Sequence, residues 1–215
     1  MSKTHSLVAH QFDDLEQQAE ADSLGMWVFL ATEVLFFGGM FAAFMIYRSA
    51  YSDVFAQASK EMAVVLGGIN TGVLLLSSLT VVLAVYAVKE NDRRGLMRNL
   101  IFTILLGLTF LVLKSIEYTE HAENHLVPGI DFQYHGLDSQ RAQIYFFMYY
   151  VMTGIHALHM LIGIGVMSVM LYGAYRNKYN SQYYMPIEVS GLYWHFVDIV
   201  WIFLYPMIYL IDVHK

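Results

Sequence analysis

The stretch YWHFVDIVWIFLYPMIYL, residues 193–210, places two ionisable side chains inside a run of apolar residues. His195 and Asp198 are three residues apart, so on a helix they lie on one face, about one turn from each other. An ionisable group inside a lipid bilayer costs free energy unless it is paired or used. The pair therefore indicates either a structural hydrogen-bonded contact or a role in handling protons or binding a metal.

Glu33 is a second candidate, because it lies in the apolar stretch SLGMWVFLATEVLFFGGMF with no charged residue within two helical turns. At a rise of about 1.5 Å per residue, it would sit near the middle of a bilayer. Its partner must be on another helix or another subunit, or must be a proton. Two interpretations stay open: a neutral glutamic acid that hydrogen-bonds a neighbouring helix, and a carboxyl group that handles protons.

Histidines and carboxylates recur at helical spacing later in the chain. Glu117 and His121 are one turn apart, and His156 and His159 share a face in TGIHALHMLIG. Such spacing suits iron, so a membrane metalloenzyme of the di-iron type is one hypothesis. These groups lie at different depths, however, and bulky Phe, Leu and Met residues fill the helices. Hydrogen-bonded packing histidines are the preferred interpretation, and no residue is predicted to bind a metal.

The composition places these groups in a membrane protein. The 215 residues are 57% hydrophobic and 14% charged, and the apolar residues form long blocks rather than amphipathic stripes. The chain has no cysteine, which excludes disulfides and thiolate chemistry. Its formal charge of −6 excludes a basic surface for nucleic acid. We therefore expect a polytopic membrane protein that does not bind nucleic acid.

Five apolar blocks are each long enough to cross a bilayer. We predict an all-α membrane bundle, because helices satisfy every backbone group within lipid, with spans at about 24–47, 62–88, 97–118, 143–172 and 189–211. Asp22 or Ser23 is expected to cap the first helix, and Pro186 stands where the fifth would start. Residues 1–23 would form an acidic cytoplasmic tail, and residues 119–142 an ordered loop on the outer side.

Lysine and arginine residues set the expected orientation of the bundle. The side of the N-terminus carries seven of them: Lys3, Lys89, Arg93, Arg94, Arg98, Arg176 and Lys178. The other side carries four, with Lys114 set aside inside a span: Arg48, Lys60, Arg141 and Lys215. The positive-inside rule therefore predicts a cytoplasmic N-terminus and an external C-terminus.

Five segments, taken in order, resemble subunit III of the haem–copper oxidases. They are SLGMWVFLATEVLFFGGMFAAF, INTGVLLLSSLTVVLAVYAVKENDRRGL, LGLTFLVLKSIEYTE, YFFMYYVMTGIHALHMLIG and GLYWHFVDIVWIFLYPMIYL. Together they run from about residue 24 to 211, which is most of the chain. The combination of YWHFVD-VW-FLY with TG-HALH and the glutamate of EV-LFF is highly specific for this family.

The resemblance implies a non-catalytic subunit of a proton-pumping terminal oxidase that reduces oxygen to water, with cytochrome c as electron donor. Haems and copper would lie in partner subunits I and II, and none in this chain. The chain would contact subunit I directly, hold structural phospholipids and support proton uptake in a bacterial plasma membrane, with subunits II and IV as further partners. Subunit III of a quinol oxidase and an accessory protein of nitric oxide reduction are the alternatives within the family.

Two alternatives come from other functional classes. One is the membrane metalloenzyme described above, which metal analysis would detect. The other is a small transporter that uses Glu33 as its coupling carboxylate. The chain shows no inverted repeat and no broken helix, which argues against the transporter.

The resemblance also implies roles for particular residues. Glu33 is expected to be the carboxyl group that reacts with carbodiimide, kept neutral by its apolar surroundings. His195 and Asp198 are expected to belong to an inward-facing polar network that is structural rather than catalytic. With the two histidines of the fourth span, the residues of this intramembrane network are His156, His159, His195 and Asp198.

Two further roles are predicted for charged residues outside the spans. By the resemblance, Arg176 and Lys178 match basic residues that bind anionic lipid head groups in longer family members, the alternative being an ordinary positive-inside loop. Four residues of the acidic tail are predicted to collect protons beside subunit I, the alternative being a solvated tail without such a role: His5, His10, Asp13 and Asp14. Lys114 stands where the family more often has glutamine, and it is expected to snorkel to the outer surface.

Overall fold

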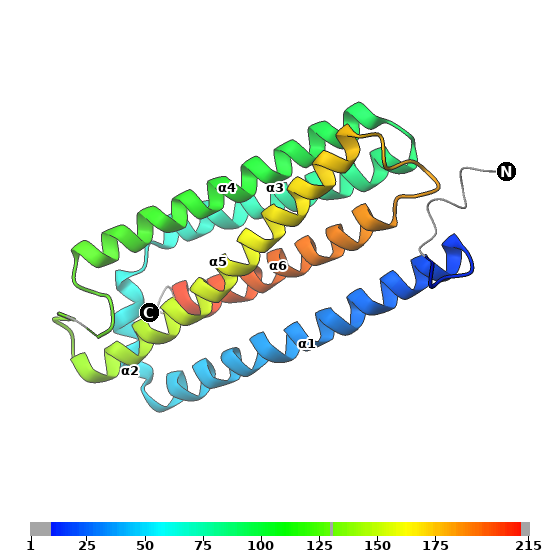
Figure 1. The fold of residues 1–215 in the computed structure, drawn as a ribbon. Helices are drawn as coiled ribbons and strands as arrows, with labels where there is room; N and C mark the ends of the chain where they lie inside the picture. The colour runs from blue at the N-terminus through cyan, green and yellow to red at the C-terminus, as the bar shows by residue number, and fades with distance from the viewer. Residues whose placement is uncertain (1–9, 130, 212–215) are drawn as a thin grey trace.

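The computed structural model describes residues 10–129 and 131–211, which form a bundle of helices (Figure 1). The elements are α1 Leu15–Ala50, α2 Ser52–Ala58, the 3-10 helix η1 Ser59–Glu61, α3 Val64–Lys89, α4 Arg93–Glu123, α5 Ser139–Tyr175 and α6 Met185–Tyr209. The described residues contain no β-strand, only one isolated bridge between Asn180 and Tyr183. Five helices (α1, α3, α4, α5 and α6) are long and apolar enough to cross a membrane, which confirms the predicted fold class.

The first long helix begins earlier than the sequence suggested. α1 starts at Leu15, and the Asp14 carboxylate caps it by accepting a hydrogen bond from Gln17 N at 2.8 Å. A side-chain acceptor at this position satisfies one of the free N–H groups of the first turn. The predicted cap at Asp22 or Ser23 is therefore wrong, since both residues lie inside the helix.

The connection between α4 and α5 is shorter than predicted. α4 continues to Glu123, so the segment expected as a loop over 119–142 is confined to residues 124–138. The Asp138 carboxylate caps α5 by accepting a hydrogen bond from Arg141 N at 3.1 Å. The polar residues at both edges of the expected loop, 119–123 and 139–142, thus belong to the last turn of α4 and the first turn of α5.

α6 is the central helix of the bundle. It packs against α1, α3 and α5, while α4 packs against α3 and α5, so α1 is attached mainly through α6. The apolar stretch of α6 is accordingly the most buried of the five, and that of α1 is the least buried. α6 begins at Met185 with Pro186 in its first turn, as predicted, where a missing N–H costs no hydrogen bond within the helix.

A tryptophan on α6 fixes how closely α4 and α5 approach it. Trp194 is fully buried and donates a hydrogen bond from Nε1 to Ser77 Oγ at 3.0 Å. A Cβ atom on Gly107 of α4 would lie 2.8 Å from this indole ring, and one on Gly163 of α5 would lie 3.1 Å from it. Glycine at both positions therefore lets the two helices close on the ring.

The connections gather at the two ends of the bundle (Figure 1). The start of α1, the turn between α3 and α4 and the connection between α5 and α6 lie at one end. The short elements α2 and η1 lie at the other end together with residues 124–138, and we call this the α2 end.

Candidate functional site

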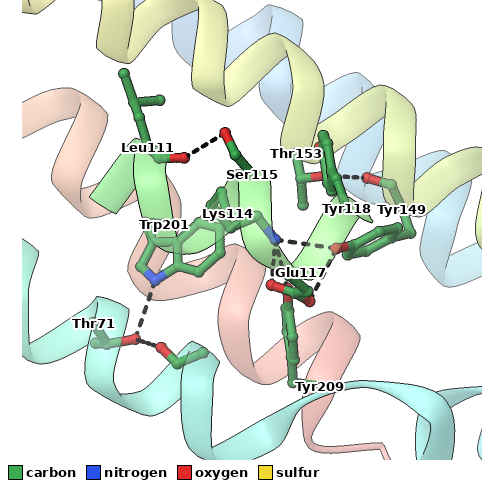
Figure 2. A network of polar contacts seen from close by, with 11 residues as sticks. Thr71, Leu111, Lys114, Ser115, Glu117, Tyr118, Tyr149, Thr153, Trp201 and Tyr209 are labelled. Carbon is green, nitrogen blue, oxygen red and sulfur yellow. Dashed lines mark hydrogen bonds and ion pairs between the residues drawn. The ribbon is translucent and has the colours of Figure 1, made fainter. Parts of the chain in front are cut away.

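Four buried side chains form a polar cluster that links α4, α5 and α6 (Figure 2). Lys114 Nζ lies 2.9 Å from Oε2 of Glu117, its ion-pair partner three residues along α4. The same ammonium donates to Tyr209 OH at 2.7 Å and to Tyr149 OH at 3.1 Å. Both hydroxyls donate in turn to Glu117 Oε1, at 2.6 Å from Tyr209 and 2.9 Å from Tyr149. In this group, which we call the Lys114 cluster, every polar side-chain atom has a partner.

The Lys114 cluster overturns the expectation that Lys114 reaches the outer surface. Only 3% of the residue is exposed, and its ammonium lies 5.2 Å from the centre of the Trp201 ring. A carboxylate and two hydroxyls already satisfy this charge, and aromatic faces attract it further, so the side chain stays inside the bundle. The pair with Glu117 was not predicted, although its three-residue spacing from Lys114 on one helix face was a sequence signal from which it could have been found.

Glu33 is paired across the bundle with His159. Glu33 Oε2 lies 3.1 Å from His159 Nε2, and the Nδ1 atom of the same ring lies 2.9 Å from Ile155 O. A carbonyl oxygen can only accept, so Nδ1 carries a proton and Nε2 faces the carboxyl group. The two atoms can therefore share one proton between α1 and α5. The side chains are 18% and 13% exposed, which places the pair at the edge of the bundle rather than at its centre.

His195 and Asp198 do not bond to each other. His195 Nδ1 lies 2.7 Å from Ser78 Oγ on α3. Asp198 is buried close to the same serine, yet neither of its carboxyl oxygens has a hydrogen bond of good geometry within the described chain. Buried polar atoms are normally satisfied by protein or by ordered water, so water is the expected partner here.

His156 is enclosed by aromatic side chains. Its ring centre lies 5.3 Å from that of Trp201, and neither ring nitrogen has a hydrogen-bond partner among the described residues. Glu117 belongs to the Lys114 cluster and His159 faces Glu33 on α1, so these two groups of the metalloenzyme hypothesis are engaged by different partners. Within the described parts of the chain, no three His, Cys, Asp or Glu side chains come together as possible metal ligands.

The four residues expected to form one intramembrane network are thus divided among different contacts. His159 faces Glu33, His195 lies beside Ser78, and His156 is enclosed by aromatic rings. No hydrogen bond between described residues joins any two of the four, which are His156, His159, His195 and Asp198. Sequence spacing had placed them on common helix faces, but it held no information about which neighbouring helix each face meets.

Arg176 and Lys178 are exposed in the connection between α5 and α6. Arg176 Nε donates to Tyr172 OH at 3.0 Å, and the guanidinium carbon lies 5.3 Å from the centre of the same ring. Nearby, Arg93 Nε donates to Ala174 O at 3.1 Å, which ties the start of α4 to the end of α5. This end of the bundle therefore presents fixed positive charge to water or to lipid head groups.

Of the four residues predicted to collect protons, His5 lies outside the described residues. His10 and Asp13 are exposed to solvent. Asp14 is engaged by Gln17 N as the cap of α1, so one of its oxygens already has a structural use.

Comparisons with known proteins identify similar sequences along most of the chain. Residues 16–213 match the family model described as cytochrome c oxidase subunit III. The chain is 32% identical to cytochrome c oxidase subunit 3 of Thermostichus vulcanus, with 93% of this chain and 92% of that protein covered. It is 34% identical to cytochrome c oxidase subunit 3 of Cyprinus carpio, over 86% of this chain and 67% of that protein. A probable quinol oxidase subunit 3 of Staphylococcus haemolyticus is 29% identical, with 93% of each chain covered.

Proposed function

The chain belongs to the cytochrome c oxidase subunit III family, which makes it subunit III of a haem–copper oxidase, and we propose that it works there as a non-catalytic subunit. The proposed complex reduces oxygen to water and pumps protons, with its haems and copper in subunits I and II. The observation that supports a non-catalytic role is the pairing of two of the candidate ligands with other side chains, since Glu117 binds Lys114 and His159 faces Glu33. The bundle would lie against subunit I and stabilise it.

This function is tested by purifying the native complex through a tag on this chain. We expect the purified complex to show the absorption bands of haem and to contain copper. When a detergent strips this subunit from the complex, the bands should stay with the remaining subunits. Haem or copper that leaves with the stripped chain, or a tagged chain that purifies without any haem protein, would contradict the proposal.

We propose cytochrome c as the electron donor of the complex. Two of the relatives described above carry that donor in their names, from Thermostichus vulcanus and Cyprinus carpio. The relative from Staphylococcus haemolyticus supports quinol as the alternative. Oxygen consumption by the purified complex separates the two: reduced cytochrome c should sustain turnover, and turnover with a quinol alone would favour the alternative.

We propose that the α2 end faces the outside of a bacterial plasma membrane and that the opposite end faces the cytoplasm. The support is the distribution of charge, because the end opposite α2 carries most of the basic residues near the spans, among them Lys89, Arg93, Arg94, Arg98, Arg176 and Lys178. Since the chain has no cysteine, a single Ser181→Cys substitution gives a clean reporter. A membrane-impermeant maleimide should label it in inverted vesicles and not in intact cells.

Arg176 and Lys178 are proposed to hold the head group of an anionic phospholipid. Two exposed cations at the membrane surface attract such a lipid by about 1 kcal/mol each. The double variant Arg176→Gln with Lys178→Gln should therefore retain less anionic phospholipid through purification than the unchanged complex. The matched double variant Arg48→Gln with Arg141→Gln, near the α2 end, controls for a general loss of charge. Equal lipid content in the first variant and the unchanged complex would contradict the site.

Glu33 is expected to react with carbodiimide, because its carboxyl group lies in an apolar part of α1, with Oε2 at 3.1 Å from His159 Nε2. Mass spectrometry should find the label on Glu33, and Glu33→Gln should abolish it while oxygen reduction largely survives. Glu117 serves as the internal control: its oxygens are occupied in the Lys114 cluster, so it should stay unlabelled. Label on another carboxyl group, or loss of turnover in Glu33→Gln, would show that the assignment is wrong.

The acidic tail is proposed to support proton uptake at the cytoplasmic surface. The triple variant His5→Gln, His10→Gln, Asp13→Asn removes titratable groups and leaves the Asp14 cap of α1 in place. Its turnover should match that of the unchanged complex at mildly acidic pH and fall more steeply above neutrality, where free protons are scarce. Superimposable pH–rate profiles, with the subunit still bound, would leave the tail without a proton role.

A further inference from the structure

A polar pocket of about 350 Å³ lies at the α2 end, between the end of η1 and the connection of residues 124–138. Two hydrogen bonds hold its walls. Gln57 Oε1 accepts from Leu137 N at 2.9 Å, which ties the connection to α2, and Gln133 N donates to His125 O at 2.9 Å within the connection. These hydrogen bonds fix the position of the connection relative to α2, and with it the shape of the pocket.

The polar side chains of the pocket include one carboxylate and several groups that can accept a hydrogen bond. The carboxylate is that of Glu61, which is exposed. The other polar lining residues are Gln57, Asn124, Gln133, Tyr134 and His135. Amide and hydroxyl oxygens accept hydrogen bonds, as does one nitrogen of a neutral imidazole, so the lining suits a ligand rich in donors.

Tyr134 shows that the pocket is incomplete as it stands. The residue is 9% exposed, and its hydroxyl has no hydrogen-bond partner among the described residues. A Cβ atom on Gly136 would overlap the hydroxyl end of this ring, so glycine at that position makes room for it. Burial, together with the negative charge of Glu61, raises the pKa of Tyr134, so its hydroxyl stays neutral beside a negatively charged group. A buried hydroxyl without a partner is uncommon and calls for a donor or acceptor from outside.

The surroundings of the pocket carry an excess of negative charge. The described residues at the α2 end include six acidic side chains, Asp53, Glu61, Glu120, Glu123, Asp131 and Asp138, against three basic ones, Arg48, Lys60 and Arg141. One of the basic residues, Arg141, already pairs with Asp138 at 3.3 Å. The net field at this end therefore attracts cations and basic protein surfaces.

We propose that this pocket receives a lysine or arginine side chain from a neighbouring protein chain of the oxidase complex, with Glu61 as its counter-ion and the Tyr134 hydroxyl as an acceptor. A basic side chain supplies several N–H donors on a long stem, which matches the acceptors of the lining. A bare metal ion fits less well, because the pocket is much larger than one ion and no three metal-type ligands converge within the described chain. The inference rests on the proposed membership of an oxidase complex.

The test is carbodiimide chemistry on the intact, purified complex, with glycine ethyl ester as the competing amine. Carbodiimide activates a carboxyl group as an O-acylisourea. A contacting lysine that has lost one proton attacks it through its free amine, so that an amide bond forms and the reagent leaves as a urea. We expect Glu61 to be cross-linked to a lysine of another chain, or to be several-fold less labelled by glycine ethyl ester than the exposed Glu123. A cross-link identifies lysine as the occupant. If Glu61 is protected from labelling without a cross-link, and this protection is lost at high salt, the occupant is arginine.

Two variants make the result specific. Glu61→Gln should remove the cross-link or the protected site, while Glu123→Gln should leave both unchanged. Labelling of Glu61 to the same extent as Glu123 would overturn the inference, and so would a cross-link within this chain alone. Copurification of haem with the chain is scored in the same preparation, so that an empty pocket in a haem-bearing complex refutes the inference and leaves the proposed function intact.

Discussion

Replacement of Glu117 by glutamine is expected to destabilise the subunit by about 3–5 kcal/mol, because it removes one partner of a buried ion pair. The Lys114 ammonium would then have to stay charged without a counter-ion or lose its proton, and both outcomes cost free energy. The hydroxyls of Tyr149 and Tyr209, which now donate to Glu117 Oε1, would face a neutral and weaker acceptor. The measurement is the temperature at which the subunit dissociates from the detergent-solubilised complex.

Two comparisons isolate the effect of burial. Glu188→Gln also removes the partner of a lysine, Lys89, at 3.1 Å, but the Glu188 side chain is 36% exposed and that of Lys89 is 43% exposed. Exposed pairs contribute about 0–1 kcal/mol, so this variant should change the dissociation temperature little. The double variant Lys114→Met with Glu117→Gln removes both buried charges and should recover much of the loss. If Glu117→Gln and Glu188→Gln lowered the dissociation temperature equally, the buried pair would contribute no more to stability than the exposed pair.

Gly107→Val is expected to destabilise the bundle by about 1–3 kcal/mol through overpacking. The first added carbon would already lie 2.8 Å from the Trp194 ring, which is fully buried and bonded to Ser77, so the ring has little freedom to move away. Valine is a better helix former than glycine by a few tenths of a kcal/mol. Any loss must therefore come from the contact between helices, and thermal dissociation of the subunit measures it.

The control for this prediction is the same exchange at an open position. A Cβ atom on Gly165 of α5 meets no other atom within 4 Å, so Gly165→Val should be tolerated. The double variant Gly107→Val with Trp194→Phe should recover part of the loss, because the smaller ring vacates the space that the valine needs. A stable Gly107→Val subunit, or one no worse than Gly165→Val, would refute the role assigned to the tryptophan.

The number and class of the spans could be predicted because lipid sets the same requirement for every segment. Apolar blocks of sufficient length appear in the sequence whatever their neighbours are, and all five became helices. The helix ends were less predictable, since capping depends on local geometry. Asp14 and Asp22 are both reasonable caps, and the helix begins after the earlier one, where the following residues LEQQAEA are good helix formers.

The partners of the intramembrane charges could be predicted only where they lie on the same helix. Glu117 is three residues from Lys114, and that spacing was visible although the sequence analysis favoured an exposed lysine. Glu33 clearly needed a partner, but His159 is 126 residues away and meets it only because α5 packs near α1. The pocket around Tyr134 was equally hidden, since it combines α2, η1 and the connection after α4.

The geometry of the Lys114 cluster also bears on how the subunit responds to the electrical potential of its membrane. A potential of 100 mV does about 2.3 kcal/mol of work on one elementary charge that crosses the whole bilayer. In the ion pair, opposite charges are separated by 2.9 Å, which is roughly a tenth of a hydrocarbon core about 30 Å thick. Even when the pair is aligned with the field, the net work is therefore about 0.2 kcal/mol per 100 mV. A lone lysine at the same depth would couple its position to the voltage, whereas the neutral pair holds three helices together with nearly the same strength in a charged and a discharged membrane.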